Sequence, residues 1–269
     1  MIANDDDGAF FAAEEAAPPR KAQLTVRRLS FEDLVQSLRQ GLSDFAQAPL
    51  YGLFFGGVYA VGGWLLVALV FWFDLPYLAY PLALGFALIA PFVCAGVYEV
   101  SRTLERGGAP TWAAVLGAIW ARAGKEFGWL ALVTLFTLIL WVDFAWTFFL
   151  IFHGLHVPNL RDFVIESLTT TTGLTYLVAG NAVGALIAFF VFSITVVTPT
   201  LLVDREIDFV TAMTTSVRLV IANPLVMVAW AAAIGGLMAL SIATGFLGLF
   251  FVLPVLGHAA WALYRRAIA

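Results

Sequence analysis

The chain has 269 residues, of which 62% are hydrophobic and only 12% are charged, and its formal net charge is −4. Soluble domains average about 45–50% apolar and about 25% charged residues, so the composition excludes a soluble enzyme and indicates an all-α integral membrane protein. The chain also lacks the basic clusters that bind nucleic acid, so no nucleic-acid partner is expected.

The first 29 residues form an acidic leader. It lacks the basic start and the long apolar core of a signal peptide. We predict that residues 1–29 are disordered and that residues 30–269 form a single transmembrane domain. The one cysteine, Cys94, lies in an apolar run, so we expect it to be a small buried side chain.

Six stretches are long and apolar enough to cross a bilayer, which takes about 20 residues of helix. They cover residues 50–73, 75–98, 128–152, 174–203, 224–243 and 245–264. Very short turns separate the first stretch from the second and the fifth from the sixth. The pattern therefore predicts six transmembrane helices arranged as three hairpins.

An amphipathic segment precedes each predicted hairpin, at about residues 31–46, 111–123 and 208–222. At the start of the first segment, Ser30 and Asp33 have the spacing of a capping box. Its apolar residues fall on one helical face; they are Phe31, Leu34, Val35, Leu38, Leu42 and Phe45. We expect all three segments to be interfacial helices on the cytoplasmic side.

Positive charge is distributed unevenly about the six predicted spans. Thirteen of the 14 Lys and Arg residues fall on the side of the chain termini, and only Arg161 falls on the other side. Short cytoplasmic loops carry the excess of Lys and Arg in membrane proteins. We therefore predict a multi-pass protein of the bacterial inner membrane with both termini in the cytoplasm.

The first predicted span is rich in glycine. On a helix, Gly52, Gly56, Tyr59 and Gly63 lie within about 60° of one another. Lipid tails are as apolar as leucine, so membrane helices associate through close packing, which small side chains permit. We expect this face to pack against a neighbouring span.

Two polar side chains fall inside the predicted spans at similar depth. Asp143 lies in the third span and Asn181 in the fourth. A carboxylate inside the membrane costs about 2.5–3.5 kcal/mol on insertion scales, which makes it a functional candidate by default. The two residues either form a hydrogen-bonded clamp between helices or line a path for a proton or cation.

The three histidines are the remaining candidates. His153 and His156 stand three residues apart near the outer end of the third span, a spacing that allows metal binding on a helix. Glycine and proline interrupt that helix, so we expect no metal there. His258 lies in the inner half of the sixth span, where we expect a carbonyl or polar neighbour to satisfy its ring.

The runs "GLSDFAQAPLYGLFFGGVYAVGGWLL" and "PFVCAGVYEVSRTLERG" resemble a family of predicted bacterial integral membrane proteins classed as a domain of unknown function. The resemblance extends from about residue 30 to the end, and it implies an inner-membrane protein without established catalytic residues. Such proteins are sometimes assigned to the core subunit of haem–copper oxidases. That subunit needs histidine ligands for two haems and a copper ion, and three histidines are too few.

No motif of a zinc protease, a serine hydrolase or a nucleotide-binding protein occurs in the chain. We expect no enzymatic activity and no catalytic or cofactor site. The scarcity of polar groups in the spans and the glycine-rich face favour an accessory or assembly factor that binds other membrane proteins, such as a respiratory complex, within the lipid bilayer. A second interpretation is a small-solute or ion transporter that uses Asp143 and Asn181.

Overall fold

The computed structural model describes residues 24–72, 76–122, 124–155 and 160–269. Its helices in chain order are α1 (Phe31–Gln47), α2 (Pro49–Phe71), α3 (Pro76–Glu105), α4 (Trp112–Arg122), α5 (Lys125–His153), α6 (Leu160–Thr169), α7 (Thr171–Thr195), α8 (Thr198–Asp204), α9 (Phe209–Ala222), α10 (Pro224–Ala243) and α11 (Leu249–Ala267). The expected all-helical class is confirmed. The sole strand-like contact within these residues is a bridge between Val26 and Ile268.

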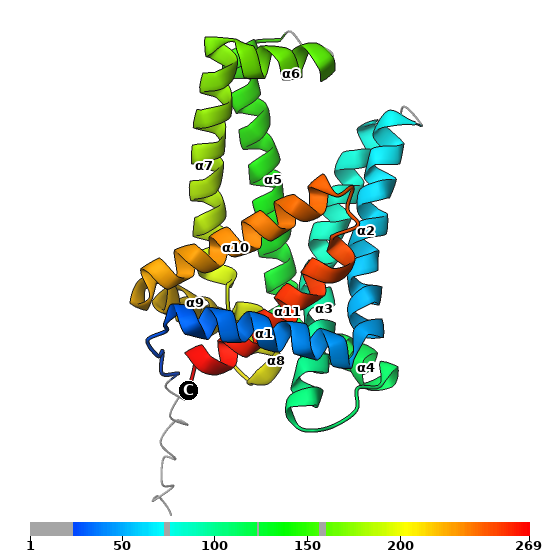
Figure 1. The fold of residues 1–269 in the computed structure, drawn as a ribbon, viewed down its shortest axis with the longest axis vertical. Coiled ribbons are helices and arrows are strands. Elements are labelled where there is room, and N and C mark those ends of the chain that lie inside the picture. Colours follow the sequence, from blue (N-terminus) through cyan, green and yellow to red (C-terminus); the bar gives the residue numbers. More distant parts are fainter. Residues whose placement is uncertain (1–23, 73–75, 123, 156–159) are drawn as a thin grey trace, which may run out of the picture.

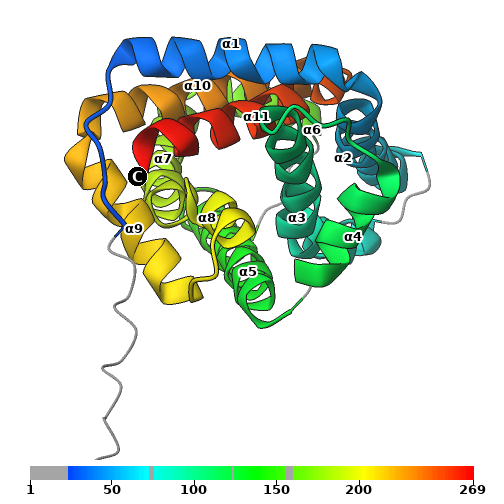
Figure 2. The same ribbon diagram turned by 90° about the horizontal axis from the view of Figure 1, so that it is seen from below.

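The helices run in two main directions. Figure 1 shows α2, α3, α5 and α7 extending along the molecule, with α6 across the far ends of α5 and α7. In Figure 2, α1, α10 and α11 lie alongside one another as one layer. The third predicted hairpin, α10 and α11, is thus oblique to α5 and α7 (Figure 1).

Four helical segments among the described residues are long and apolar enough to cross a membrane. They are Pro49–Phe71 in α2, Glu126–His153 in α5, Thr171–Asp204 across α7 and α8, and Pro224–Ala243 in α10. The sixth predicted span corresponds to α11, which carries Arg265 and Arg266 in its last turn and is not among the four.

The fourth predicted span, residues 174–203, is two helices instead of one. α7 ends at Thr195, and α8 starts at Thr198 with Pro199 in its first turn. Proline has no backbone N–H to donate and disfavours helical geometry in the residue before it. The break before Pro199 is therefore a local consequence of the sequence.

The face of α1 that packs on the protein is not simply its apolar face. Phe31, Val35 and Leu42 are exposed. The buried residues follow a different stripe: Leu34, Ser37, Gly41 and Asp44. The sequence did not indicate this arrangement, because hydropathy alone does not tell which side of an amphipathic helix packs on the protein. Here the smaller and more polar side packs on the protein, and the apolar side faces outward.

The main core lies at the end of the molecule that contains α8 and α9. Its largest fully buried side chains are Leu201, Leu219, Met227, Trp230 and Tyr264 from α8 to α11, and Phe127 from α5. A smaller cluster joins α2, α3 and α4 through Phe55, Val97, Val100 and Val115. The packing is thus concentrated where the oblique layer meets the longer helices.

The described end of the predicted leader is held by hydrogen bonds. The Arg27 N–H donates to the Ala267 carbonyl at 2.8 Å, and the Ala269 N–H donates to the Thr25 carbonyl at 3.0 Å. The buried Asn223 side chain accepts from the Leu29 N–H at 2.7 Å and donates to the Arg27 carbonyl at 3.0 Å. The folded part of the chain therefore begins before residue 30; residues 1–23 lie outside the described part.

Candidate functional site

Three polar side chains from three helices form a continuous hydrogen-bonded chain. The hydroxyl of Ser101 on α3 lies 3.0 Å from Oδ2 of Asp44 on α1 and 2.7 Å from Nδ1 of His258 on α11. The exposed fractions are 4% for Asp44, 1% for Ser101 and 0% for His258. We refer to these residues as the Asp–Ser–His chain.

A close approach of α1 and α11 makes this contact possible. A Cβ atom on Gly41 would lie 2.5 Å from the Val255 carbonyl oxygen and 2.7 Å from the Ala259 nitrogen. Only glycine leaves room for two helix backbones at such a distance. Asp44 follows Gly41 by about one helical turn, and His258 precedes Ala259, so the same contact brings the carboxyl and the imidazole together.

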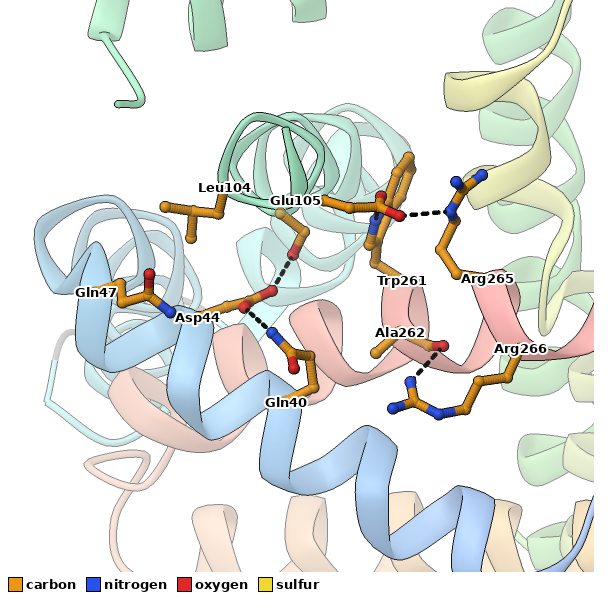
Figure 3. A pocket seen from close by; sticks show the side chains of 10 residues that line it. Gln40, Asp44, Gln47, Leu104, Glu105, Trp261, Ala262, Arg265 and Arg266 are labelled. Atoms are coloured by element: carbon orange, nitrogen blue, oxygen red, sulfur yellow. Dashed lines mark hydrogen bonds and ion pairs between the residues drawn. The ribbon is translucent and has the colours of Figure 1, made fainter. Parts of the chain in front are cut away.

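A cleft of about 270 Å³ opens beside the Asp–Ser–His chain, between α1, α3 and α11 (Figure 3). Asp44 and Ser101 line it, together with Gln40, Glu105 and Arg265. Inside the cleft, the Gln40 amide donates to Oδ1 of Asp44 at 2.7 Å (Figure 3). Because His258 does not line the cleft, Asp44 and Ser101 stand between the imidazole and the open space.

Charged groups at the mouth of the cleft tie α3, α8 and α11 together. Arg265 pairs with Glu105 at 2.9 Å and with Asp204 at 3.3 Å. Trp261 donates its indole N–H to the same glutamate at 3.1 Å. The Tyr264 hydroxyl donates to Asp204 at 2.6 Å. These contacts fix the inner ends of the three helices relative to one another.

The order of the three groups differs from that of a hydrolytic triad. In such a triad the histidine lies between the acid and the serine, so that it can take the serine proton. Here Ser101 lies between Asp44 and His258, and it is itself buried. Burial raises the pKa of the Asp44 carboxyl, and the hydrogen bonds from Gln40 and Ser101 oppose that rise. The arrangement is suited to holding a proton.

The sequence singled out His258 but neither Asp44 nor Ser101. For His258, the structure supplies the polar neighbour that was expected. Asp44 was missed because a carboxylate in an amphipathic segment is ordinary until its neighbours are known. The usable signal was the spacing of Leu34, Ser37, Gly41 and Asp44, in which small or polar residues recur every three or four positions.

The structure does not join Asp143 to Asn181. Both side chains are exposed, and no hydrogen bond connects them among the described residues. The Asn181 amide donates instead to the Leu177 carbonyl of its own helix at 2.7 Å. A cavity of about 500 Å³ between α5 and α7 is lined by Asn181 but not by Asp143. Transport through these two residues stays a prediction.

The outer histidine region is aromatic. The His153 ring stacks on Phe149 with centroids 4.8 Å apart and meets the edge of Tyr176 at 4.9 Å. His156 lies outside the described residues. Within the described part of the chain, no three His, Cys, Asp or Glu side chains gather as a metal site would require.

The glycine face of α2 lies against α11 and the turn before it. A Cβ atom on Gly56 would lie 2.6 Å from the Leu249 carbonyl oxygen, and one on Gly63 would lie 2.6 Å from the Phe246 ring. At Gly52, the nearest neighbours are the Phe45 ring and Pro254. Tyr59, the fourth residue of the face, packs against the smaller core cluster.

The fold and its long apolar helices define a helical integral membrane protein. Residues 79–204, from α3 to α8, match the model of a family described as "Predicted integral membrane protein (DUF2189)". This match confirms the resemblance to a membrane-protein family of unknown function, over a shorter range than predicted. Ser101 lies inside the matched range, whereas Asp44 and His258 lie outside it. Neither a curated protein nor a solved structure matches the chain.

Proposed function

We propose that the protein is a non-enzymatic accessory or assembly factor that binds other membrane proteins through α5 and α7. One observation carries this proposal. The membrane-length segment Glu126–His153 has 0% of its most apolar window buried inside the protein, compared with 39% for α2. A long apolar helix that its own chain leaves uncovered presents its surface to lipid and to other membrane proteins.

Toward the end that carries α6, α5 and α7 pack on each other and on α6. Trp141 packs over Gly184, and Phe148 packs over Gly180. Figure 1 shows this pair standing apart from α2 and α3 toward the end that carries α6. The outward faces carry exposed apolar side chains: Phe136, Leu140, Leu186 and Phe190. Such faces are available for packing against helices of a partner.

The exposed carboxyl of Asp143 favours a protein, rather than lipid alone, as the neighbour of α5. It is exposed on α5, and a carboxyl group that faces lipid costs about 2.5–3.5 kcal/mol. A hydrogen-bond donor on a partner helix would offset that cost. Removing the carboxyl should therefore weaken partner binding without damaging the isolated protein.

Affinity purification from native membranes tests the proposal. The wild type should retain a membrane protein in fixed stoichiometry. Asp143→Leu should lose it, while Asp143→Asn, which still accepts a hydrogen bond, should keep most of it. Val61→Ala, at an exposed apolar position on α2 outside the proposed binding face, is the matched control. A wild-type preparation without a stoichiometric partner, or full retention by Asp143→Leu, would contradict the proposal.

We further propose six membrane crossings with both termini in the bacterial cytoplasm. The uneven distribution of Lys and Arg supports this topology. So does the position of α6, with Arg161, at the end of the molecule opposite α1 and the C-terminus (Figure 1). In this topology the Asp–Ser–His chain and its cleft lie toward the cytoplasm.

A further inference from the structure

The Asp–Ser–His chain contains two contacts of hydrogen-bond length, so it needs two protons. Ser101 supplies one of them, because a hydroxyl donates a single hydrogen bond. The second proton must come from Asp44 or from Nδ1 of His258. The distances of 3.0 Å to Asp44 and 2.7 Å to His258 are compatible with that proton at either end of the Asp–Ser–His chain.

These two arrangements interconvert by a paired shift. With the proton on His258, the ring is an imidazolium that also carries a proton on Nε2; its Nδ1–H donates to Ser101, and Ser101 donates to ionised Asp44, so the later loss of the Nδ1 proton leaves a neutral ring. In the shift, the Nδ1–H bond breaks as a new Oγ–H bond forms on Ser101. At the same time the original Oγ–H bond breaks and an Oδ2–H bond forms on Asp44. No other bond changes, and no co-reactant is required.

The surroundings act differently on the two ends of the Asp–Ser–His chain. Asp44 and Ser101 line the cleft, so the carboxyl end of the chain can exchange protons with water there. His258 is fully buried, and its Nε2 has no hydrogen-bond partner among the described residues. Burial raises the pKa of the Asp44 carboxyl above its ordinary value.

Few other charged groups lie near the Asp–Ser–His chain. α11 contributes Arg265 and Arg266 to the cleft, α3 contributes Glu105, and Asp204 of α8 pairs with Arg265. The Arg265–Glu105–Asp204 contacts engage both of these acids. α2 and α10, which also pack on α11, contain no Asp, Glu, Lys, Arg or His. No second acid or base from those two helices competes with Asp44 and His258.

We propose that Asp44, Ser101 and His258 form a proton-binding site, in which one proton is shared between Asp44 and His258 through the Ser101 hydroxyl and exchanges with water at the cleft. The site joins α1, α3 and α11, so a change in its proton content changes the charge at the junction of three helices. It is independent of the partner-binding proposal, since it requires only the isolated protein.

Nuclear magnetic resonance of the ¹⁵N-labelled histidine ring tests this site. The purified full-length protein with His153→Gln and His156→Gln retains His258 alone, and its ring nitrogens are followed from about pH 4 to about pH 9. We expect one titration. Asp44→Asn should lower its midpoint by at least about one pH unit, a tenfold loss of proton affinity, because a neutral amide no longer stabilises the imidazolium.

The serine variants examine the bridge itself. Ser101→Thr keeps the hydroxyl and should leave the midpoint close to that of the wild type. Ser101→Ala should move the midpoint in the same direction as Asp44→Asn. Circular dichroism of each variant checks that the helices are intact. If Ser101→Ala fails to fold, the comparison of the wild type with Asp44→Asn alone tests whether the two groups share a proton. Identical midpoints for wild type and Asp44→Asn, or a ring without any titration, would overturn the proposal.

Discussion

At the scale of single residues, the start of α1 shows how one carboxylate stabilises a helix end. The Ser30 N–H donates to Asp33 at 2.7 Å, and the Asp33 N–H donates to the Ser30 hydroxyl at 3.3 Å. The backbone hydrogen bond from Ser30, followed by that of its side chain, lowers the pKa of Asp33. This capping box was predictable because all its partners lie within four consecutive residues.

The lowered pKa of Asp33 gives a stability effect with a defined sign. The ionised form stabilises the fold above the unfolded-state pKa of about 4, and this contribution is lost as the pH falls through the lower folded-state pKa. Asp33→Asn should cost about 0.5–1 kcal/mol at neutral pH. Unfolding measured between pH 7 and pH 3 should show the two proteins converging at the acid end. A difference that stays constant with pH would contradict this explanation.

The Asp–Ser–His chain could not be derived from local patterns. Its members are 57 and 157 residues apart along the sequence, and no periodicity within one helix encodes which helices meet. His258 drew attention as a polar residue in an apolar run. Asp44 did not, because a carboxylate in an amphipathic helix is ordinary until its neighbours are known.

At the scale of helices, Gly41 allows α1 and α11 to pack backbone against backbone. Gly41 faces the backbone of α11 at Val255 and Ala259. The nearest atoms, the Val255 carbonyl oxygen and the Ala259 nitrogen, belong to the backbone and cannot move aside as a flexible side chain could. The contact therefore depends on the absence of a side chain at this one position.

Substitution of Gly41 should separate the two helices. Gly41→Ala introduces a steric conflict worth about 1–3 kcal/mol by analogy with overpacked cores, which exceeds the gain of up to about 1 kcal/mol in helix propensity. The matched control is Gly235→Ala in α10, because an added Cβ there meets no atom within 4 Å. Thermal unfolding in detergent should show Gly41→Ala destabilised and Gly235→Ala unchanged or stabilised. Equal stability of both variants would contradict the assigned contact.

Helix positions were predictable, whereas helix orientation was not. Hydropathy and capping placed α1, α4 and α9 close to their observed bounds, and Pro199 marked the break that the hydropathy run concealed. The oblique path of α10 and α11, by contrast, could not be predicted from the sequence (Figure 1). The length of an apolar stretch sets whether it is able to span, but its tilt is set by packing against other helices.

At the scale of the whole molecule, the charged contacts and the main core lie at the same end of the fold. The main core and the charged contacts of Arg265 lie at the end with α8 and the C-terminus, whereas α5 and α7 extend toward α6 (Figure 1). In the proposed topology, the contacts that stabilise the fold are therefore concentrated toward one side of the membrane. In the proposed function, the end with α6 is the one that packs against partners.

The proposed topology can be tested by cysteine labelling of intact cells. Single cysteines are placed at Gln36, Thr171 and Ala269, each exposed in the structure, with Cys94 changed to serine. Ala267 near the C-terminus is fully buried and unsuitable. An impermeant thiol reagent should label only the Thr171 position, because the thirteen inner Lys and Arg residues keep the other two in the cytoplasm. All three positions should label after permeabilisation, which shows that each thiol is reactive. Labelling at Gln36 or Ala269 in intact cells would rule out six crossings with both termini inside.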